Sequence, residues 1–145
     1  DESTVVELKD GRLYLNMRTY RGTGCRAIAF SNDKGKTWQP TQNDEALVEP
    51  VCQGSCIGYD TQDGKRFVLF SNPASKKREK MTVRLSQDDC KTWPSAKELQ
   101  GGPAAYSDLV VLPDGTIGCL YERGEKSAYE RITFARFSLE WLTEK

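Results

Sequence analysis

The feature that most constrains the fold of this chain is a repeat of about fifty residues. Three Asp-Gly pairs, at positions 10–11, 63–64 and 114–115, stand 53 and then 51 residues apart. Each pair lies between two short runs rich in β-branched and aromatic residues, and such a pair favours a tight hairpin because glycine adopts the positive φ that the turn requires. The sequence therefore predicts paired strands over 4–8 and 12–18, 56–59 and 66–71, and 109–112 and 116–122.

A second repeated element interleaves with the first. The octapeptide from Ser31 to Trp38 recurs 55 residues later, from Ser86 to Trp93, and each copy follows a further strand-like run, over 26–30 and 81–85. The aspartate at its third position can accept hydrogen bonds from nearby backbone N–H groups and hydroxyls, so each copy is expected to form a turn of its own. Cys90 stands where the first copy has a glycine, which predicts a second turn that is either strained or differently shaped.

Two tight turns per period give about four strands, and a repeated four-stranded unit of this length is typical of a β-propeller. The expected fold is therefore all-β, and 145 residues hold about three such blades. Because propellers usually need four to eight blades to close a ring, the chain is expected to be about half of one. No separate second domain is expected within residues 1–145, and residues 138–142 are expected to form a short helical turn or a closing segment.

The composition excludes several classes of function. Histidine is absent, which excludes a Ser-His-Asp triad, a Cys-His dyad and a His-ligated zinc site in this chain. The 21 basic and 21 acidic side chains cancel, so nucleic acid is not an expected partner, and the apolar runs are too short for a membrane-spanning helix. The five cysteines lack the spacing of a disulfide framework or a zinc site and are expected to be buried or partly buried thiols.

Alignment of the three units on their Asp-Gly turns places candidate functional residues at matching positions. Eight residues before each aspartate stand Glu2, Ser55 and Tyr106, and seven residues after each glycine stand Arg18, Ser71 and Glu122. The first strand of each propeller blade lines the central channel, so equivalent positions lie at similar depth. Two carboxylates, a phenol and an arginine are thus predicted to converge near the axis, where they form either a functional site or a satisfied polar network.

These motifs resemble those of one enzyme family. The Ser-x-Asp-x-Gly-x-Thr-Trp octapeptide is the Asp box, which occurs in several kinds of propeller. More specific is a set of motifs that resembles the bacterial and animal exo-α-sialidases, in order and over essentially the whole chain. Its members are Glu2-Ser3, Leu15-Asn16-Met17-Arg18, Pro50-Val51-Cys52-Gln53-Gly54-Ser55, Ala105-Tyr106-Ser107-Asp108-Leu109 and Ile117-Gly118-Cys119-Leu120-Tyr121-Glu122. The resemblance implies the C-terminal half of a six-bladed catalytic propeller, with its Asp boxes away from the site.

The resemblance also implies two catalytic residues. Tyr106 is similar to the nucleophile of the family and Glu2 to its general base. A neutral phenol suits an anionic sugar, because the carboxylate nucleophile usual in retaining glycosidases would face like-charge repulsion, and sialidases are known exceptions to that scheme. With an unperturbed pKa near 10, only about one tyrosine in a thousand is ionised at pH 7, so the phenol needs a base to take its proton.

Further residues are implied to bind the substrate. Arg18 is similar to the second of three arginines that bind the sialic acid carboxylate. Arg78, eight residues before the second Asp box, matches the third better than Arg84, which falls within a strand. A planar guanidinium binds a carboxylate through two parallel hydrogen bonds and stays charged at physiological pH. Glu122 resembles the carboxylate that orients the first arginine, and that arginine and the acid/base aspartate are expected outside this chain. Gln53 and Ser55 are weaker candidates for contacts with the sugar, a turn or channel-wall role being the alternative.

The function implied is an exo-α-sialidase that removes terminal sialic acid from glycoconjugates with retention, through a glycosyl-tyrosine intermediate. The partners implied are sialylated glycans and the rest of the propeller, and the location implied is secreted, periplasmic or on the cell surface. No cofactor and no metal-ligating residue are expected in this chain. The isolated segment is expected to be inactive. Two alternatives remain open: a non-catalytic Asp-box propeller that binds sialylated glycans, which would not need a Glu–Tyr pair, and a trans-sialidase, which would share every residue named here.

Overall fold

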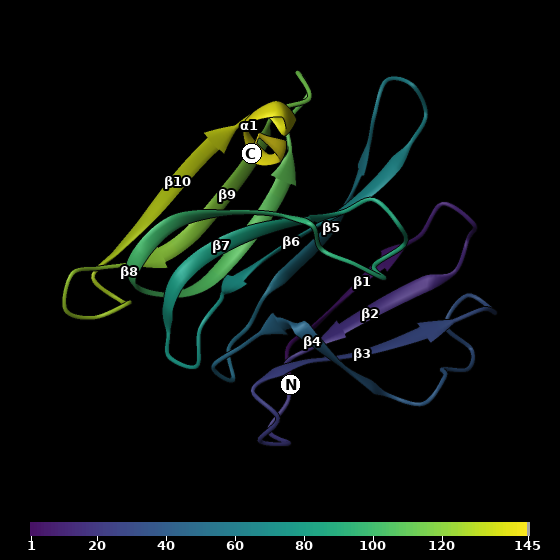
Figure 1. Ribbon diagram of the computed structural model, residues 1–145, viewed down its shortest axis with the longest axis horizontal. Helices are drawn as coiled ribbons and strands as arrows, with labels where there is room; N and C mark the ends of the chain where they lie inside the picture. Colours follow the sequence, from purple (N-terminus) through teal and green to yellow (C-terminus); the bar gives the residue numbers. More distant parts are fainter. Residues whose placement is uncertain (145) are drawn as a thin grey trace.

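The computed structural model describes residues 1–144, which form ten β-strands and one short helix (Figure 1). The first sheet is antiparallel and follows chain order, with strands β1 (Ser3–Glu7), β2 (Leu13–Met17), β3 (Cys25–Ser31) and β4 (Gln42–Val48). The second sheet has the order β10-β9-β8-β7-β6-β5. Its strands are β5 (Ser55–Asp60), β6 (Arg66–Pro73), β7 (Glu79–Ser86), β8 (Ser95–Val111), β9 (Ile117–Arg123) and β10 (Arg131–Phe137). The prediction of an all-β fold is confirmed.

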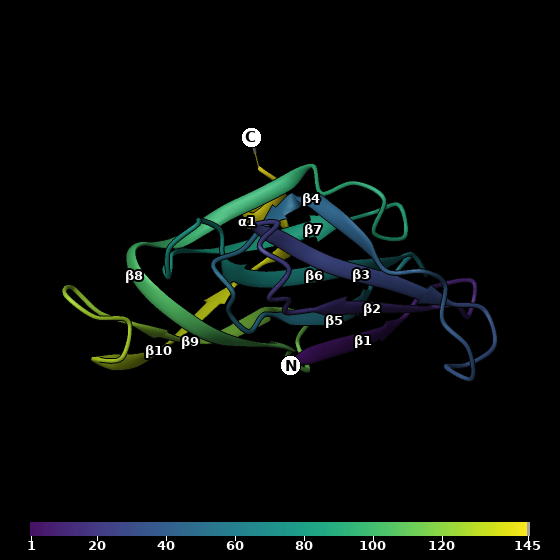
Figure 2. The same cartoon turned by 90° about the horizontal axis from the view of Figure 1, so that it is seen from below.

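The long strand β8 belongs to two successive units. Its first part, up to Pro103, pairs with β7, and its second part, from Ala104, pairs with β9. Figure 2 shows β8 as one curved strand that runs from the side of β7 to the side of β9. The second sheet thus consists of a four-stranded unit, β5 to the first part of β8, and a three-stranded unit formed by the second part of β8 with β9 and β10. The first two units match the predicted blades, whereas within residues 1–144 the third has three strands.

The turns lie where the sequence predicts them. The three Asp-Gly pairs join β1 to β2, β5 to β6 and β8 to β9. Their glycines, Gly11, Gly64 and Gly115, have φ of 84°, 77° and 81°, which is the left-handed conformation that glycine adopts without a steric penalty. Each Asp-Gly pair therefore marks the turn between the first two strands of its unit.

The two Asp boxes close the hairpins β3–β4 and β7–β8 with matching hydrogen bonds. The Asp33 carboxylate accepts from the Thr37 backbone N–H at 2.8 Å and from the Thr37 hydroxyl at 2.6 Å, and Asp88 repeats both contacts with Thr92, at 2.9 and 2.6 Å. Cys90 has a φ of 63° and therefore keeps the left-handed conformation of the glycine it replaces. The second turn is thus strained rather than differently shaped, at a cost of about 1–2 kcal/mol, and the Cys90 side chain is buried.

Two apolar clusters fill the spaces between successive units. Strand β6 shows why: Val68 and Phe70 point into one cluster, and Leu69, between them, points into the other, because successive side chains of a strand project to opposite faces. The first cluster contains Val6, Leu8, Tyr14, Ile28, Leu47, Cys56, Val68, Phe70, Cys90 and Trp93. The second contains Leu69, Met81, Val83, Leu85, Ala104, Leu109, Ile117, Cys119, Tyr121, Phe137 and Leu142. The five cysteines are all buried and unpaired, as predicted.

A short helix, α1 (Leu139–Thr143), follows β10. The Ser138 hydroxyl accepts a hydrogen bond from the Trp141 backbone N–H at the start of this helix, and Leu142 is buried in the second cluster. The expected helical turn over 138–142 is therefore present. No helix within residues 1–144 is long and apolar enough to cross a membrane.

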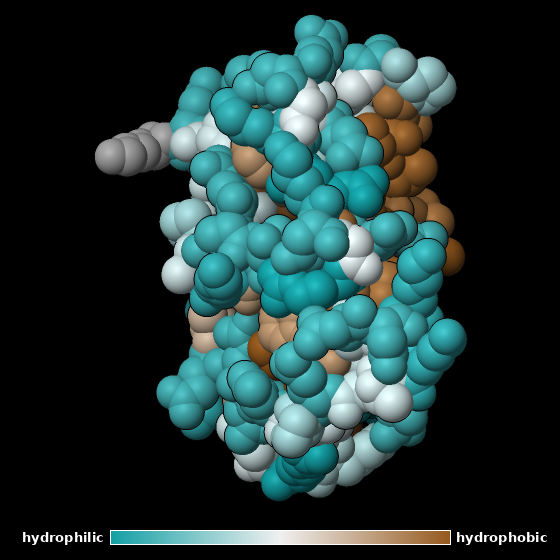
Figure 3. Space-filling model, turned by 90° about the vertical axis from the view of Figure 1, so that its right-hand side faces the viewer, coloured by the Kyte–Doolittle hydropathy of each residue, from teal (hydrophilic) through white to brown (hydrophobic). Residues whose placement is uncertain are grey.

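The strands of the third unit leave apolar side chains on the surface. Val110, Leu120, Ile132 and Phe134, from β8, β9 and β10, are between 44% and 69% exposed. In the view of Figure 3 most of the surface is hydrophilic, and hydrophobic residues gather along one edge. A cluster of exposed apolar side chains on one sheet is a feature of surfaces that pack against a further element.

Candidate active site

The first strands of the three units lie side by side, since β1 contacts β5 and β5 contacts β8. Glu2 immediately precedes β1, and Tyr106 lies in β8. The Tyr106 hydroxyl donates a hydrogen bond to Glu2 Oε1 at 2.5 Å, although the two residues are 104 positions apart in the chain. The alignment of the Asp-Gly turns predicts this meeting, because both residues occupy the same position in their units.

Arg18 joins this pair from the end of β2. Its Nη1 donates to both carboxylate oxygens of Glu2, at 3.0 and 3.1 Å, and to the Tyr106 hydroxyl at 3.1 Å. Its Nη2 donates to the Tyr20 hydroxyl at 2.7 Å. The Arg18 side chain is only 11% exposed, whereas that of Glu2 is 39% exposed. A guanidinium, a carboxylate and a phenol thus form one compact cluster that solvent reaches from the side of Glu2 and Tyr106.

The second candidate arginine, Arg78, also lies next to Tyr106. Its guanidinium stands over the Tyr106 ring, 5.7 Å from the ring centre. Its Nη1 donates to the Tyr129 hydroxyl at 2.6 Å, and its Nη2 to the Val51 carbonyl at 3.3 Å. Arg84, within β7, instead has Asp44 as its charged neighbour, and burial lowers the pKa of its guanidinium. Of these two arginines, the structure places Arg78 beside the tyrosine.

Glu122 and Gln53 hold the backbone around Tyr106. Glu122, on β9, accepts a hydrogen bond from the Tyr106 backbone N–H at 3.0 Å. The Gln53 side-chain amide bonds both backbone groups of Ser107, donating to its carbonyl at 2.9 Å and accepting from its N–H at 3.0 Å. The two side chains therefore fix the segment of β8 that presents the phenol.

Ser55 lies deeper than the other candidates. It is 3% exposed, and its hydroxyl accepts from the Leu109 N–H at 3.0 Å and donates to Asp108 at 3.2 Å. Its contacts fasten β5 to β8 inside the fold.

A hollow of about 450 Å³ opens beside Tyr106, with Gln53, Glu122 and Ile132 among its lining residues. Within residues 1–144 no three His, Cys, Asp or Glu side chains are grouped so that they could hold a metal ion.

The contact between Glu2 and Tyr106 changes the acidity of both groups. The hydrogen bond from Tyr106, with help from the Arg18 charge, lowers the pKa of Glu2 to about 2. The same hydrogen bond, together with desolvation and the charge of Glu2, raises the pKa of Tyr106, and Arg18 opposes that rise. At neutral pH, Glu2 is therefore an ionised acceptor and Tyr106 a neutral donor.

Replacing Glu2 by glutamine is expected to lower the pKa of Tyr106. The substitution removes the negative charge that disfavours the phenolate and leaves the Arg18 guanidinium that favours it. The measurement is a pH titration of phenolate absorbance, in which a Tyr106→Phe version of each protein is subtracted so that only Tyr106 remains. Glu7→Gln, at the exposed far end of β1, is the control and should leave that pKa unchanged. A pKa that stays constant or rises in Glu2→Gln would contradict this account of the pair.

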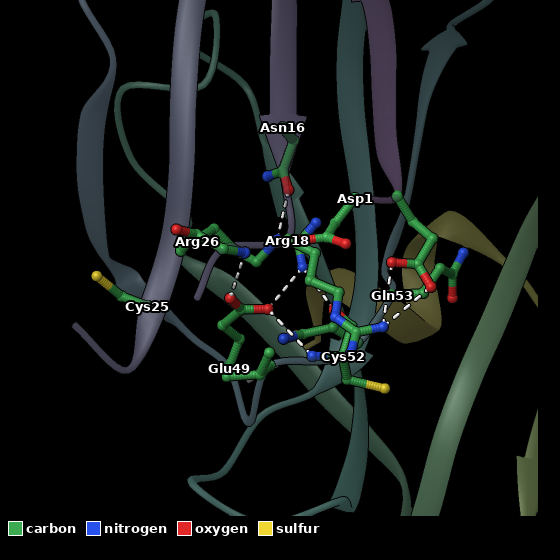
Figure 4. Close-up of polar contacts among 12 residues, drawn as sticks. Asp1, Asn16, Arg18, Cys25, Arg26, Glu49, Cys52 and Gln53 are labelled. Carbon is green, nitrogen blue, oxygen red and sulfur yellow. Dashed lines mark hydrogen bonds and ion pairs between the residues drawn. The ribbon is translucent and has the colours of Figure 1, made fainter. Parts of the chain in front are cut away.

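Sequence reasoning did not single out a buried ion pair that lies beneath the cluster. Arg26 on β3 donates through Nη1 to Glu49 Oε2 at 2.7 Å, and the two side chains are 0% and 1% exposed (Figure 4). One arginine within an apolar strand is a recognisable signal, because an arginine is almost never fully buried without a partner. Glu49 carries no comparable signal, since only the folded chain brings it under β3.

Comparison with known proteins relates the whole chain to sialidases. The model of the BNR repeat-like domain family matches residues 2–119. A sialidase of Micromonospora viridifaciens is 42% identical over 148 aligned positions, which cover 98% of this chain and 22% of that protein. A solved Hadza microbial sialidase is 36% identical, with a TM-score of 0.85 over 98% of this chain and 28% of its own. The intramolecular trans-sialidase of Ruminococcus gnavus, solved with oseltamivir carboxylate, is 28% identical, with a TM-score of 0.83 over 99% of this chain and 34% of its own.

The chain spans about a fifth to a third of the length of these proteins. Within that span its two complete units and its third, shorter one superpose on sialidase propellers, which confirms the predicted fold class. With most of its length matched by the family model and with sialidases aligned along nearly all of it, the chain belongs to the BNR repeat-like domain family and is homologous to part of the sialidases.

Proposed function

We propose that residues 1–145 form the C-terminal half of a six-bladed catalytic propeller, and that the intact protein is an exo-α-sialidase. Its reaction is the hydrolysis of terminal sialic acid from glycoconjugates. The observation that carries the proposal is the cluster of Glu2, Arg18 and Tyr106, joined by hydrogen bonds of 2.5 to 3.1 Å. The relatives that match nearly the whole chain and are themselves called sialidases support it.

The two arginines suit a substrate whose carboxylate is attached to the carbon under attack. Arg18 lies 3.1 Å from the phenol oxygen, and Arg78 stands over the face of the same ring. An anion bound between these guanidinium groups is brought next to the nucleophile, and the anion offsets the positive charge gathered there. Glu122 then has a second role, which is to orient a further arginine supplied from outside this chain. The polar atoms of Gln53 and Ser55 bond β8 and so support the strand that carries the proposed nucleophile, and Gln53 also lines the hollow beside Tyr106.

The proposed reaction has two displacements. In the first, the Tyr106 oxygen attacks the anomeric carbon while its proton passes to Glu2, and the bond to the aglycone oxygen breaks as an acid outside this chain protonates that oxygen. In the second, water attacks the same carbon while the group outside this chain, now the base, takes a proton from that water, the bond to Tyr106 breaks, and the phenol regains its proton from Glu2. Two inversions give net retention. Glu2 accepts the proton during attack rather than before it, because its charge raises the pKa of the phenol.

The remainder of the ring is proposed to pack against the third unit. The exposed apolar side chains of β8, β9 and β10 would be covered by a blade from the N-terminal half of the ring, just as the two clusters fill the spaces between the units described above. This arrangement also accounts for the expected inactivity of the isolated segment, because the acid/base group and the first arginine would come from the other half.

The intact protein is expected to hydrolyse a fluorogenic α-sialoside, and NMR should detect the α-anomer of the free sugar as the first product. The β-anomer as first product would contradict the retaining mechanism. Binding of sialosides without turnover would favour the non-catalytic propeller. A cyclised anhydro sugar in place of the free sugar would favour an intramolecular trans-sialidase, the activity of the Ruminococcus gnavus protein that matches this chain.

A further inference from the structure

The buried pair of Arg26 and Glu49 forms hydrogen bonds with the chain on both sides of Arg18. Arg26 Nε donates to the Asn16 side-chain oxygen at 2.6 Å, two residues before Arg18 on β2. Glu49 Oε1 accepts from the backbone N–H of Thr19, the next residue along, at 3.2 Å. In the view of Figure 4, Asn16 lies above Arg26 and Glu49 lies below it, and dashed lines mark the contacts of Arg26 with both. The position of the Arg18 backbone therefore depends on this pair.

The same pair also fixes the segment that follows β4. Arg26 Nη1 donates to the Cys52 carbonyl at 2.7 Å, and Glu49 Oε2 accepts from the Cys52 backbone N–H at 3.4 Å. Cys52 is fully buried, so both of its backbone polar groups are satisfied by the ion pair. The neighbour on one side of Cys52 is Gln53, which holds the β8 backbone, and the neighbour on the other side is Val51.

Val51 links this segment to Arg78. It has a φ of 55°, which is a strained conformation for a β-branched residue. In that conformation its carbonyl accepts the hydrogen bond from Arg78 Nη2. A strained residue persists only where its surroundings hold it, and the bonds from Arg26 and Glu49 to the adjacent Cys52 supply that restraint.

A buried ion pair adds little net stability compared with apolar side chains of similar size, because desolvation of the two charges opposes their attraction. Its directional hydrogen bonds, however, hold the surrounding groups in place. We propose that Arg26 and Glu49 are positioning residues that set the separation between Arg18 and Arg78, and so determine how well the site binds a substrate carboxylate. This inference rests on the proposed function, in which those two arginines bind that carboxylate.

The test is the double variant Arg26→Met/Glu49→Leu of the intact protein, assayed with a fluorogenic α-sialoside. Replacement of both charges leaves no unpaired buried ion, so the variant is expected to fold. We expect KM to rise by about tenfold or more while kcat changes by less than about threefold, the pattern for interactions made equally in the ground and transition states. Arg26→Lys, which keeps a positive charge beside Glu49 but has a single nitrogen for the contacts with Asn16, Glu49 and Cys52, should move KM in the same direction by a smaller factor and serves if the double variant does not fold.

The matched control is Arg66→Met/Asp60→Leu, which removes an arginine–carboxylate pair with two 2.8 Å hydrogen bonds at the far end of β5. It should leave both kinetic constants unchanged. An unaltered KM in folded Arg26→Met/Glu49→Leu, a fall in kcat alone, or an equal rise of KM in the control would each overturn the proposal. Turnover by the wild-type protein tests the proposed function separately. If the wild-type protein does not hydrolyse the sialoside but binds free sialic acid, the ratio of variant to wild-type Kd for that sugar is measured in place of KM. If the wild-type protein neither binds the sugar nor hydrolyses the sialoside, both proposals are overturned.

Discussion

Replacing Tyr106 by phenylalanine in the intact protein is expected to lower kcat by roughly 10²–10⁴-fold, the range for the loss of a group that takes part in proton transfer at the reacting centre. The substitution removes the oxygen that is proposed to attack the sugar, together with its hydrogen bond of 2.5 Å to Glu2 Oε1. It keeps the ring that lies under Arg78, so KM should change much less than kcat. The measurement is the steady-state hydrolysis of a fluorogenic α-sialoside.

Tyr59→Phe provides a matched control for this change. Tyr59 is also a strand tyrosine whose hydroxyl makes a hydrogen bond, in this case to the Gly115 carbonyl at 2.9 Å, but it lies by the Asp-Gly turns at the opposite end of the strands. Its loss should reduce stability slightly and leave kcat within about twofold. Undiminished turnover by Tyr106→Phe would exclude the phenol as nucleophile, and an equal loss in both variants would point to a general effect on folding.

The meeting of Glu2 and Tyr106 could be predicted from the sequence because it depends on local turn chemistry. Each Asp-Gly pair fixes the end of a hairpin, and equal spacing from that turn places a residue at the same depth in each unit. The path of β8 could not be predicted in this way. Residues 101–103 read Gly-Gly-Pro, which ordinarily indicates a loop, yet the strand runs through them from one unit into the next. The tertiary pairing with β7 and β9 overrides the local preference.

The buried residues beneath the site are harder to predict from the sequence than its exposed residues. Tyr106 and Arg18 lie in motifs with a fixed distance to a turn, whereas Glu49 lies in an irregular segment after β4 and acquires its role only when that segment folds under Arg26. The left-handed Val51 is similar, because nothing in its side chain favours that conformation. Such residues depend on contacts between units rather than on the pattern within one.

Replacing Arg18 by lysine is expected to lower kcat/KM by roughly 10²-fold, although the charge is conserved. Arg18 uses one terminal nitrogen for Glu2 and Tyr106 and the other for the Tyr20 hydroxyl. The single nitrogen of lysine can contact the catalytic pair or reach toward the substrate carboxylate, but it cannot present two parallel donors. Loss of charge-assisted hydrogen bonds of this kind costs about 2–5 kcal/mol, and most of it should appear as a rise in KM.

Two further variants, Arg18→Ala and Arg21→Lys, serve as comparisons for Arg18→Lys. Arg18→Ala removes the charge as well as the fork, so its loss of kcat/KM should exceed that of Arg18→Lys by about tenfold or more. It should also raise the pKa of Tyr106, because the Arg18 charge holds that pKa down. Arg21→Lys changes an exposed arginine three residues along the chain and should leave the kinetics unaltered. A wild-type KM in Arg18→Lys would show that a positive charge at position 18 is enough for substrate binding. The two parallel hydrogen bonds to the carboxylate would then have to come from Arg78 or from the arginine supplied from outside this chain.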